Sequence, residues 1–459
     1  MPNVDALLRA QGTSLRGFVD VPVCCPSRTS TLSGRYSHNL NNSLQGWCGN
    51  FEAAHENRTW IARLRDAGNY STGLFGKYYN DYAAYCDAHV KVPSDWSRFF
   101  SMCNDNLYFG NSFNDGGRML KVGADVYMTD VIANASLAWL AEAARPGAPP
   151  FFAYVAPHAP HVPATPAHKY ENAPLPGNAS RAPRTPSWDA SVPHHHWVVA
   201  DKVPLTPALV DFSDELWARR LRSTMSVDDL VRDVVALLQA TGALANTFII
   251  FTSDHGYNLG NFRLPSGKFH AFENDIRVPF IVRGPGVARG AARSDVLVNN
   301  VDIAATVLEL SGVGAAGYLH DGRSFAGQLS AAAQAPPWPR DRLVFEYWGL
   351  GFTMRGPCHN GTSPCPGGPE ALEDAPSNTW AGLRILNATH NIKYAEYRPA
   401  VDSPIVPSST NFTLAFDLNA DPYELVNAAA PGGSLSPDTL AQLSEELWAV
   451  AMCAGPACP

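Results

Sequence analysis

Apolar side chains recur at helical spacing along the stretch between Ser226 and Gly242. The recurring positions are Val227, Leu230, Val231, Val234, Leu237 and Leu238. This spacing is typical of a helix that buries one face. Ser226 is suited to cap the N-terminus of the helix, and Gly242 follows its last turn. The pattern therefore predicts a helix that begins after Ser226.

Three short apolar runs predict strands: Thr72–Phe75, Phe151–Val155 and Thr247–Thr252. The third is apolar without interruption, which is typical of a parallel strand buried on both faces. Polar side chains follow the three runs, namely Lys77, His158, and Asp254 with His255. In open α/β sheets, ligands bind at the carboxyl ends of the strands. We therefore expect these side chains to share one site.

Proline-rich stretches divide the rest of the chain. Residues 156–207 are rich in proline and predict a long insertion that shapes the site. A second such stretch, 331–339, separates the main body from a smaller C-terminal part. There we expect antiparallel strands at 380–385, 392–397 and 412–418, and a helix over 437–452 capped by Ser436. We predict two units, residues 1–340 and residues 341–459.

Composition limits the function classes. The chain has 459 residues, 46% hydrophobic and 17% charged, which indicates a globular α/β protein larger than one small core. Its net charge is −8 and it contains no basic block, so nothing indicates a nucleic-acid partner. We also find no apolar run long enough to span a bilayer.

Cysteines and glycosylation sequons favour a secreted or lumenal protein. The chain has nine cysteines, and the short spacings Cys358–Cys365 and Cys453–Cys458 suit local disulfides. Sequons of the form N-x-Ser/Thr occur at Asn41, Asn57, Asn69, Asn134, Asn178, Asn360, Asn387 and Asn411. The chain starts Met-Pro-Asn-Val-Asp, without the basic and apolar regions of a signal peptide. Two alternatives follow: an incomplete N-terminus, or a protein that is not secreted.

The segment from Val23 to Gly34 reads Val-Cys-Cys-Pro-Ser-Arg-Thr-Ser-Thr-Leu-Ser-Gly. Pro26 suits the first turn of a helix, and this places Cys24 and Arg28 around a helix N-terminus, where anions bind. A plain alternative is a cysteine pair at the start of a helix, with one of them in a disulfide.

The segment resembles the sulfatase family, whose motif is Cys-x-Pro-Ser-Arg followed by Leu-Thr/Ser-Gly. The resemblance extends over nearly the whole chain, through Gly76-Lys77, Pro157-His158, Asp254-His255-Gly256, Gly267-Lys268 and the loop 416–424. The double cysteine, His196-Trp197 and Ser226-Val-Asp-Asp-Leu230 resemble the branch of N-acetylglucosamine-6-sulfatases and algal arylsulfatases. The family fold implied is an alkaline-phosphatase-like α/β sandwich, with a large mixed, mainly parallel sheet between helices and a smaller antiparallel sheet.

The resemblance implies hydrolysis of sulfate esters through formylglycine, which a formylglycine-generating enzyme makes from Cys24. Its hydrate has two hydroxyls, one of which attacks sulfur while the other later allows sulfate to be eliminated. Arg28 would orient this diol, Lys77 and Lys268 would hold sulfate oxygens, and His158 would protonate the leaving oxygen. The substrate would be a sulfated sugar or an aryl sulfate.

Metal binding is implied as well, with one calcium ion held by Asp254 and His255, although calcium prefers oxygen ligands. Relatives open with an apolar strand that ends in paired aspartates, and we find no equivalent here. Asp5 and Asp20 are poor substitutes because neither ends an apolar strand. The loss of such a strand would leave its neighbours with unpaired edges. An incomplete N-terminus would explain this absence together with that of the signal peptide.

Two further positions are of interest. Many relatives carry a histidine two residues after the lysine of Gly-Lys, where it assists sulfate elimination, whereas this chain has Tyr79. Another group would have to take that role, or turnover would be slow. In the run His194-His-His196 we expect two exposed loop residues, with His196 lining the substrate entrance.

Two alternatives to a sulfatase remain open at this point. Relatives with the same nucleophile hydrolyse phosphonates and phosphodiesters, and turnover of aryl sulfate against aryl phosphate would separate the two activities. A catalytically silent protein that binds sulfated glycans is the other alternative.

Overall fold

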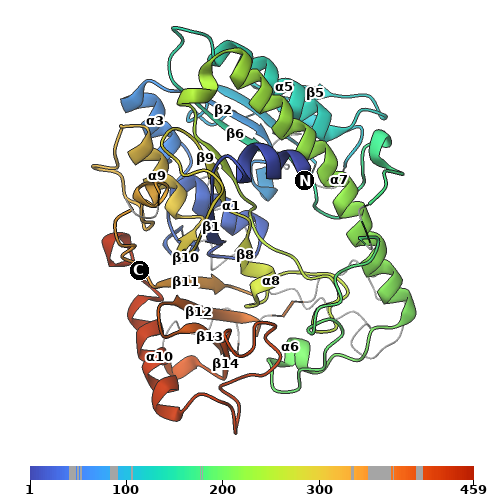
Figure 1. Ribbon diagram of the computed structural model, residues 1–459, viewed down its shortest axis with the longest axis vertical. Helices are drawn as coiled ribbons and strands as arrows, with labels where there is room; N and C mark the ends of the chain where they lie inside the picture. Colours follow the sequence, from blue (N-terminus) through green and yellow to red (C-terminus); the bar gives the residue numbers. More distant parts are fainter. Residues whose placement is uncertain are drawn as a thin grey trace.

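The computed structural model describes residues 1–40, 48, 51, 54–82, 91–104, 107–175, 177, 179–331, 335–349, 374–375, 377–399 and 407–459. Two five-stranded mixed sheets form the main body, and a four-stranded antiparallel sheet lies at the C-terminal end (Figure 1). None of the helices in the described ranges is both long and apolar enough to cross a membrane.

The first sheet has the order β10-β1-β9-β7, with β8 paired to β1. Its strands are β10 (Ala291–Asn299), β1 (Thr13–Phe18), β9 (Ile281–Arg283), β7 (Ile249–Phe251) and β8 (Arg277–Val278). The second sheet has the order β5-β4-β3-β2-β6. Its strands are β5 (Arg118–Lys121), β4 (Ser112–Asp115), β3 (Arg98–Met102), β2 (Ser71–Gly76) and β6 (Phe151–Ala156).

Helices cover both sheets. They are α1 (Cys24–Ser33), α3 (Trp60–Gly68), α5 (Met128–Ala143), α6 (Trp197–Ala200), α7 (Pro207–Ala240), α8 (Glu273–Ile276), α9 (Asp302–Leu310) and α10 (Pro437–Val450). Figure 1 shows α5 and α7 side by side across β2 and β6, with α1 near the centre of the molecule. All ten residues of α1 are buried, because α3 and α9 contact it.

The C-terminal sheet has the order β11-β12-β13-β14, and α10 lies along it. Its strands are β11 (Arg342–Tyr347), β12 (Thr379–Leu386), β13 (Asn391–Arg398) and β14 (Phe412–Asp417). Sequence reasoning predicted the last three and missed β11. One apolar core joins this sheet to the main body, since Phe345 and Trp380 cluster with Phe18 and Leu297. The boundary between residues 340 and 341 stays a prediction.

The predicted start of the long helix was wrong. The helix α7 begins at Pro207, and the Thr206 side chain accepts a hydrogen bond from Leu209 N. Ser226 lies inside α7 and is buried, so it caps nothing. Proline at the first helical position has no N–H to leave unpaired, which makes Thr206-Pro207 the stronger start signal. The end was predicted correctly, since Gly242 follows with a φ of 75°.

The predicted strand over 247–252 exists in shortened form as β7, but its pairing differs. It is antiparallel to β9 and half-buried, not parallel and fully buried. Both β7 and β6 are terminal in their sheets, and β6 is also half-buried along its length. Each of the two five-stranded sheets therefore ends in an apolar strand that, among the described strands, pairs on one side only.

Candidate active site

Cys24 is the first residue of α1, and Val23 before it is extended. The helix carries the Pro26-Ser27-Arg28 sequence in its first turns and ends at Gly34, whose φ is 66°. A Cβ at Gly34 would lie 2.4 Å from the Ala304 Cβ, so no side chain fits there. The end of α1 therefore packs closely against α9 and requires glycine at position 34. The neighbouring Cys25 forms a disulfide with Cys48, which leaves Cys24 as a free, buried thiol.

Two nitrogen atoms contact the Cys24 sulfur. Lys268 Nζ lies 2.9 Å from it and His255 Nε2 lies 3.2 Å from it. Burial alone would raise the pKa of the Cys24 thiol, but Lys268, Lys77 and His255 favour the thiolate and hold that pKa well below its usual range. The site therefore stabilises negative charge at position 24.

Arg28 joins the ends of two strands. Its Nε and Nη2 lie 2.9 and 2.8 Å from Asp254 Oδ2, beyond β7, and its Nη1 donates to the Lys77 carbonyl at 3.1 Å, beyond β2. Burial would raise the pKa of Asp254, but Arg28 and His255 hold it below its usual range. Ser27 Oγ donates to the Asp254 carbonyl at 2.5 Å. The first turn of α1 thus holds the loop after β7.

Lys77 and His158 follow neighbouring parallel strands. Gly76 pairs with Ala156 in the ladder between β2 and β6, and Lys77 N donates to the Ala156 carbonyl at 2.8 Å. Gly76 has a φ of 105°, and a Cβ there would lie 2.2 Å from the Ala156 carbonyl oxygen. Only glycine allows this approach. Lys77 is 1% exposed and His158 is 4% exposed, so both side chains are inside the site.

His158 lies in a group of aromatic and imidazole rings. Its ring is tilted by 32° against that of His161, with centroids 4.4 Å apart, and within the described part of the chain neither ring nitrogen of His158 has a hydrogen-bond partner. Burial, His161 and Lys77 hold the pKa of His158 well below its usual range. Sequence reasoning did not single out His161. The repeat Ala156-Pro-His-Ala-Pro-His161 was the available signal.

Arg220 is a second residue that sequence reasoning missed. It lies on α7, its Nη1 donates to the Pro160 carbonyl at 2.8 Å, and its guanidinium covers the Tyr257 ring at 4.6 Å. Burial lowers the pKa of Arg220, and the Asp254 carboxylate acts in the opposite direction. No local motif marks this position, because Arg220 belongs to the site through the packing of α7.

His196 is placed differently from the other predicted residues. It caps α6, is 3% exposed and stacks on Tyr397 of the C-terminal sheet with centroids 4.3 Å apart. Burial lowers its pKa to about 3. The expectation of two exposed histidines in this run was wrong, because His195 is also buried and its Nε2 bonds the Glu424 carbonyl at 2.8 Å. A role for His196 at the substrate entrance stays a prediction.

The side chains of Tyr79 and Asp20 make their contacts away from Cys24. Tyr79 is buried among Phe51, Tyr78 and Tyr82. Asp20 follows β1 and is fully buried, with its carboxylate bonded to Ser30 Oγ at 2.6 Å and Asn300 Nδ2 at 2.9 Å. Burial raises the pKa of Asp20 to about 7. Its carboxylate fastens the turn after β1 to α1.

The donors available to a metal ion are few. Among the described residues, ligand atoms of Cys24, Asp254 and His255 lie within 4.8 Å of one another. Calcium takes six to eight oxygen ligands, whereas this group offers one carboxylate, one imidazole and one sulfur. Asp254 Oδ2 is also bonded to Arg28. These residues alone do not fit calcium, and we derive no chemical step at an ion.

The side chains around position 24 carry the positive charge that is needed to bind an anionic ester. Three cationic side chains, Arg28, Lys77 and Lys268, lie around position 24, against one carboxylate. Preorganised cations in a buried site stabilise charge that develops on a transferring oxyanion. A nucleophile at position 24 and imidazoles beside it complete the groups needed to cleave such an ester.

Comparison with known proteins agrees with this chemistry. The family model named Sulfatase matches residues 1–313. An N-acetylglucosamine-6-sulfatase of Capra hircus is 35% identical over 469 residues, covering 99% of this chain and 80% of that protein. An arylsulfatase of Volvox carteri is 29% identical and covers 93% of this chain and 68% of that protein.

A solved structure shares the fold. That structure is a protein in complex with "its substrate D-Glucosamine-2-N, 6-O-disulfate". It matches this chain with a TM-score of 0.71 and 18% sequence identity, and the match covers 97% of this chain and 91% of that one. The predicted fold class, an alkaline-phosphatase-like mixed sheet with helices and a C-terminal antiparallel sheet, is confirmed. The family match and the close relatives establish that this chain is a sulfatase, a member of the family of sulfuric ester hydrolases.

Proposed function

We propose that this sulfatase removes sulfate from a sulfated amino sugar such as N-acetylglucosamine-6-sulfate, or from an aryl sulfate, with formylglycine at position 24. The observation that carries the proposal is the position of Cys24 at the start of α1, with the Lys268 ammonium 2.9 Å from its sulfur. The relatives named for glucosamine-6-sulfate and aryl sulfate hydrolysis supply the substrate class.

The side chains divide into those that bind sulfate and those that move protons. Lys77 and Lys268 bind the sulfate oxygens, and Arg28 orients the group at position 24 while Asp254 holds Arg28 in place. His158 donates a proton to the leaving alcohol oxygen, since its ring is buried, the charge at Cys24 acts on it, and its nitrogens are unpaired within the described structure. Burial excludes water, which strengthens each of these interactions.

Conversion of Cys24 to formylglycine requires a formylglycine-generating enzyme as a partner. Cys24 is 1% exposed, so that enzyme has no access to it once α1 has packed. We therefore expect conversion to occur before folding. Family resemblance favours calcium as the metal, but Asp254 and His255 would need further oxygen ligands, so the proposed steps use side chains alone.

The cysteines and sequons support a secreted, extracellular or lysosomal location. Disulfides Cys25–Cys48 and Cys453–Cys458 are present, and such bonds persist in oxidising compartments. The five sequon asparagines within the described ranges are all exposed, as glycosylation requires. They are Asn57, Asn69, Asn134, Asn387 and Asn411. Cys358, Cys365, Asn41, Asn178 and Asn360 lie outside the described residues.

The test is to produce the protein with and without a formylglycine-generating enzyme. An aldehyde at residue 24 would be quantified by mass spectrometry of the peptide that contains it. Release of sulfate would be measured with N-acetylglucosamine-6-sulfate and an aryl sulfate, against the matched aryl phosphate. We expect sulfate release in proportion to aldehyde content, and a loss of about 10⁶-fold in Cys24→Ala, down to background.

The other outcomes each decide against the proposal. Faster release of phosphate than of sulfate would indicate a phosphoesterase of the same fold. Aldehyde-bearing protein that binds sulfated sugars without releasing sulfate would indicate a binding protein.

A further inference from the structure

A cavity of about 480 Å³ is bordered by four segments of the main body. They are Gln11 before β1, Gln239 near the end of α7, residues of the segment 242–245, and residues of the segment 283–289 at the end of β9. Arg283 pairs with Ile249, the first residue of β7, whereas Asp254 follows the last residue of that strand. The cavity therefore lies at the opposite end of β7 from the active site, and it shares no lining residue with that site.

Positive charge is concentrated in this cavity. Its charged lining residues are Arg283 and Arg289, and no carboxylate lines it among the described residues. Neither guanidinium forms an ion pair in the described part of the chain, although the chain has 42 acidic residues against 34 lysines and arginines. Burial and the charge of Arg289 lower the pKa of Arg283, so the two guanidiniums are near enough to repel each other. An anion bound between them would offset this repulsion.

The backbone and one of the two side chains are held in place before any ligand arrives. Arg283 Nη1 donates to the Leu7 carbonyl at 2.6 Å, which fixes the guanidinium at the wall of the cavity. The residue before Arg289 is Ala288, whose carbonyl accepts from Thr13 Oγ1 at 2.8 Å. Because these contacts already restrict the cationic groups, binding an anion costs less conformational freedom than it would on a mobile loop.

The uncharged lining of the cavity suits a small sugar. The side-chain amides of Gln11 and Gln239 have no hydrogen-bond partner within the described structure, so they are available to hydroxyl groups. A Cβ at Gly242 or Gly286 would meet nothing within 4 Å, so the backbone there borders open space. No aromatic side chain is found among the described lining residues, so the base of a nucleotide would have no ring to stack on. The volume is within the range of small-ligand sites, roughly 300–1,000 Å³.

We propose that this cavity is a second, non-catalytic site for an acidic saccharide, whose sulfate or carboxylate group is bound by Arg283 and Arg289. A guanidinium presents paired N–H donors that match either oxyanion. Gln11 and Gln239 bind the hydroxyl or amide groups of the same sugar. The choice of a saccharide rests on the proposed function, because a sulfatase of sulfated sugars meets acidic saccharides as its substrates. The chain then holds two sugars at once, one at position 24 and one in the cavity.

The test counts bound sugars in Cys24→Ala protein, which has no nucleophile and leaves the ligand intact. In calorimetric titration with N-acetylglucosamine-6-sulfate, we expect two molecules to bind per chain. Adding Lys268→Met should weaken the site at position 24 and leave the cavity site. Adding Arg283→Gln/Arg289→Gln should instead raise the dissociation constant of the cavity site by about 10–100-fold, because charge-assisted hydrogen bonds are lost.

A second variant tests the cavity with both arginines in place. Ala245 is exposed at its wall, so Ala245→Glu would bring a carboxylate to the arginines and should also weaken binding there. Arg118→Gln/Lys121→Gln is the matched control, because it makes the same change of charge at two exposed residues of β5. It should keep both bound sugars. Unchanged melting temperatures would show that each variant is folded.

Further probes identify the group that the arginines bind. Tighter binding of N-acetylglucosamine-6-sulfate than of glucuronic acid would identify sulfate as the recognised group, and the reverse order would identify carboxylate. Neutral N-acetylglucosamine should bind at least tenfold more weakly than either. If it binds equally well, the arginines do not recognise the ligand, and the assignment is wrong. Inorganic sulfate that binds the cavity as tightly as the sugars would likewise overturn a saccharide site.

The cavity site and the proposed function fail in different ways. One bound sugar per chain that is lost in Lys268→Met, or no bound sugar at all, would overturn the cavity site. Two bound sugars that both persist in Arg283→Gln/Arg289→Gln would overturn it as well. If the cavity binds sugars but aldehyde-bearing protein releases no sulfate from any ester tested, the proposed function fails while the binding site stands.

Discussion

At the scale of single residues, charge is concentrated around one buried position. Position 24 receives a hydrogen bond from Lys268, a contact from His255 and the field of Lys77. Burial removes the water that would otherwise screen these groups. Each cation therefore acts more strongly than it would at the surface.

Lys268 is the cation in direct contact with position 24, so its replacement should be costly. We expect Lys268→Met to lower kcat/KM for an aryl sulfate by about 10²–10³-fold, because a preorganised donor to the sulfate oxygens is lost. Lys268→Arg should retain more activity, since it keeps the charge. Steady-state kinetics on aldehyde-bearing protein would measure this. Lys169→Met, at an exposed lysine, is the control, and a loss in Lys268→Met no larger than in this control would contradict the assignment.

His38 provides a residue-scale prediction about stability. Its Nδ1 lies 3.1 Å from Glu346 Oε1 and its Nε2 lies 2.9 Å from the Cys453 carbonyl, so both nitrogens face acceptors. Burial alone would lower the pKa of His38, but Glu346, the Cys453 carbonyl and Asp321 outweigh it and raise the pKa to about 9. The folded protein therefore favours the protonated, imidazolium form of His38.

Because the folded pKa of about 9 exceeds the ordinary value of 6.5, the stabilisation is complete below pH 6.5 and is lost as pH rises through 9. It amounts to roughly 3 kcal/mol. We expect the free energy of unfolding in urea to fall more between these pH values in the parent protein than in His38→Gln. The pKa of Asp20 is also raised, but Asp20 titrates in both proteins. Its contribution to the pH dependence therefore cancels when the parent protein is compared with His38→Gln. Equal falls in the two proteins would contradict the charged state of His38.

Most of the site residues follow from sequence because they lie in short motifs at strand ends or at the start of α1. Cys24, Arg28, Lys77, Asp254 and Lys268 were found in this way. His161 and Arg220 were not. The place of His161 depends on the turn that folds it back onto His158, and that of Arg220 on the packing of α7 against the loop at Pro160. Such contacts are set by tertiary structure, which local patterns do not encode.

At the scale of elements, α7 shows how a local pattern misplaces a boundary. The apolar spacing after Ser226 is real, but it is the continuation of a helix of 34 residues that begins at Pro207. The strand β7 shows the same limit, since its apolar run predicted a strand but not its antiparallel partner β9. Pairing depends on which strands are near in space. By contrast, α10 begins at Pro437 after Ser436 as predicted, because the cap and the proline are local signals.

The true start of α7 can be tested through its cap. Thr206→Ala removes the side chain that accepts from Leu209 N, and we expect the free energy of unfolding to fall by about 1 kcal/mol. Thr206→Asn keeps an acceptor at the cap and should leave stability close to that of the parent. Urea denaturation followed by circular dichroism would measure both. Equal stability of Thr206→Ala and Thr206→Asn would show that the cap does not hold the helix start.

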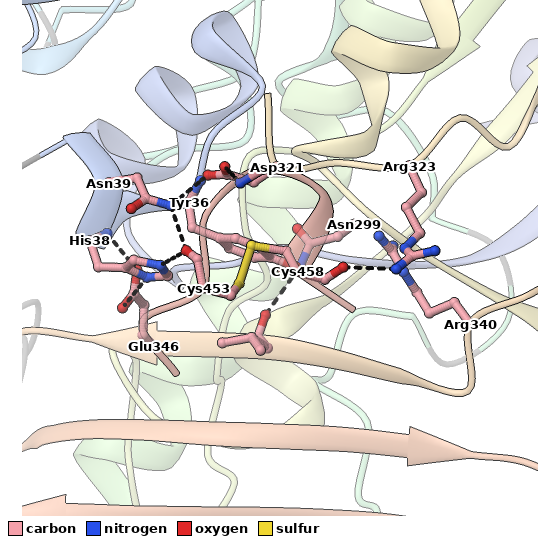
Figure 2. The surroundings of a disulfide bond; sticks show 12 residues. Tyr36, His38, Asn39, Asn299, Asp321, Arg323, Arg340, Glu346, Cys453 and Cys458 are labelled. Carbon is pink, nitrogen blue, oxygen red and sulfur yellow. Dashed lines mark hydrogen bonds and ion pairs between the residues drawn. A yellow bond between two sulfur atoms is a disulfide. The ribbon is translucent and has the colours of Figure 1, made fainter. Parts of the chain in front are cut away.

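At the scale of the whole molecule, the C-terminus is fastened to the loop that follows α1. Figure 2 shows the loop closed by the Cys453–Cys458 disulfide, with His38 and Asn39 directed at the Cys453 carbonyl. Arg323 donates to the Cys458 carbonyl at 2.9 Å. Sequence reasoning predicted this disulfide from its spacing, and the structure confirms it. The last residues of the chain thus bind the catalytic body directly.

Asp321 completes the attachment from the other side. Its carboxylate accepts from Tyr36 N at 2.8 Å, from Asn39 Nδ2 at 2.8 Å and from Gly455 N at 2.7 Å. One buried carboxylate therefore links the chain after α1 to the disulfide loop. Closure of that loop by the disulfide reduces the freedom that its backbone would otherwise lose on docking.

We therefore expect the double variant Cys453→Ala/Cys458→Ala to lose about 2 kcal/mol of unfolding free energy, as loop-closure entropy gives for a loop this short. Hydrogen exchange should accelerate in residues 451–459 and also in residues 36–40, because the Cys453 carbonyl is shared with His38 and Asn39. Sulfatase activity at low temperature should be kept, since Cys24 and its contacts lie elsewhere, while heat inactivation should begin at a lower temperature.

Met452→Ala is the matched control, because that side chain is 48% exposed and belongs to the same loop. It should change neither exchange nor stability beyond a few tenths of a kcal/mol. Faster exchange confined to residues 451–459 would mean that the loop after α1 holds its place without the C-terminus. Faster exchange in both segments would show that the disulfide loop supports the chain that leaves α1, and hence links the C-terminal end to the helix that begins at Cys24.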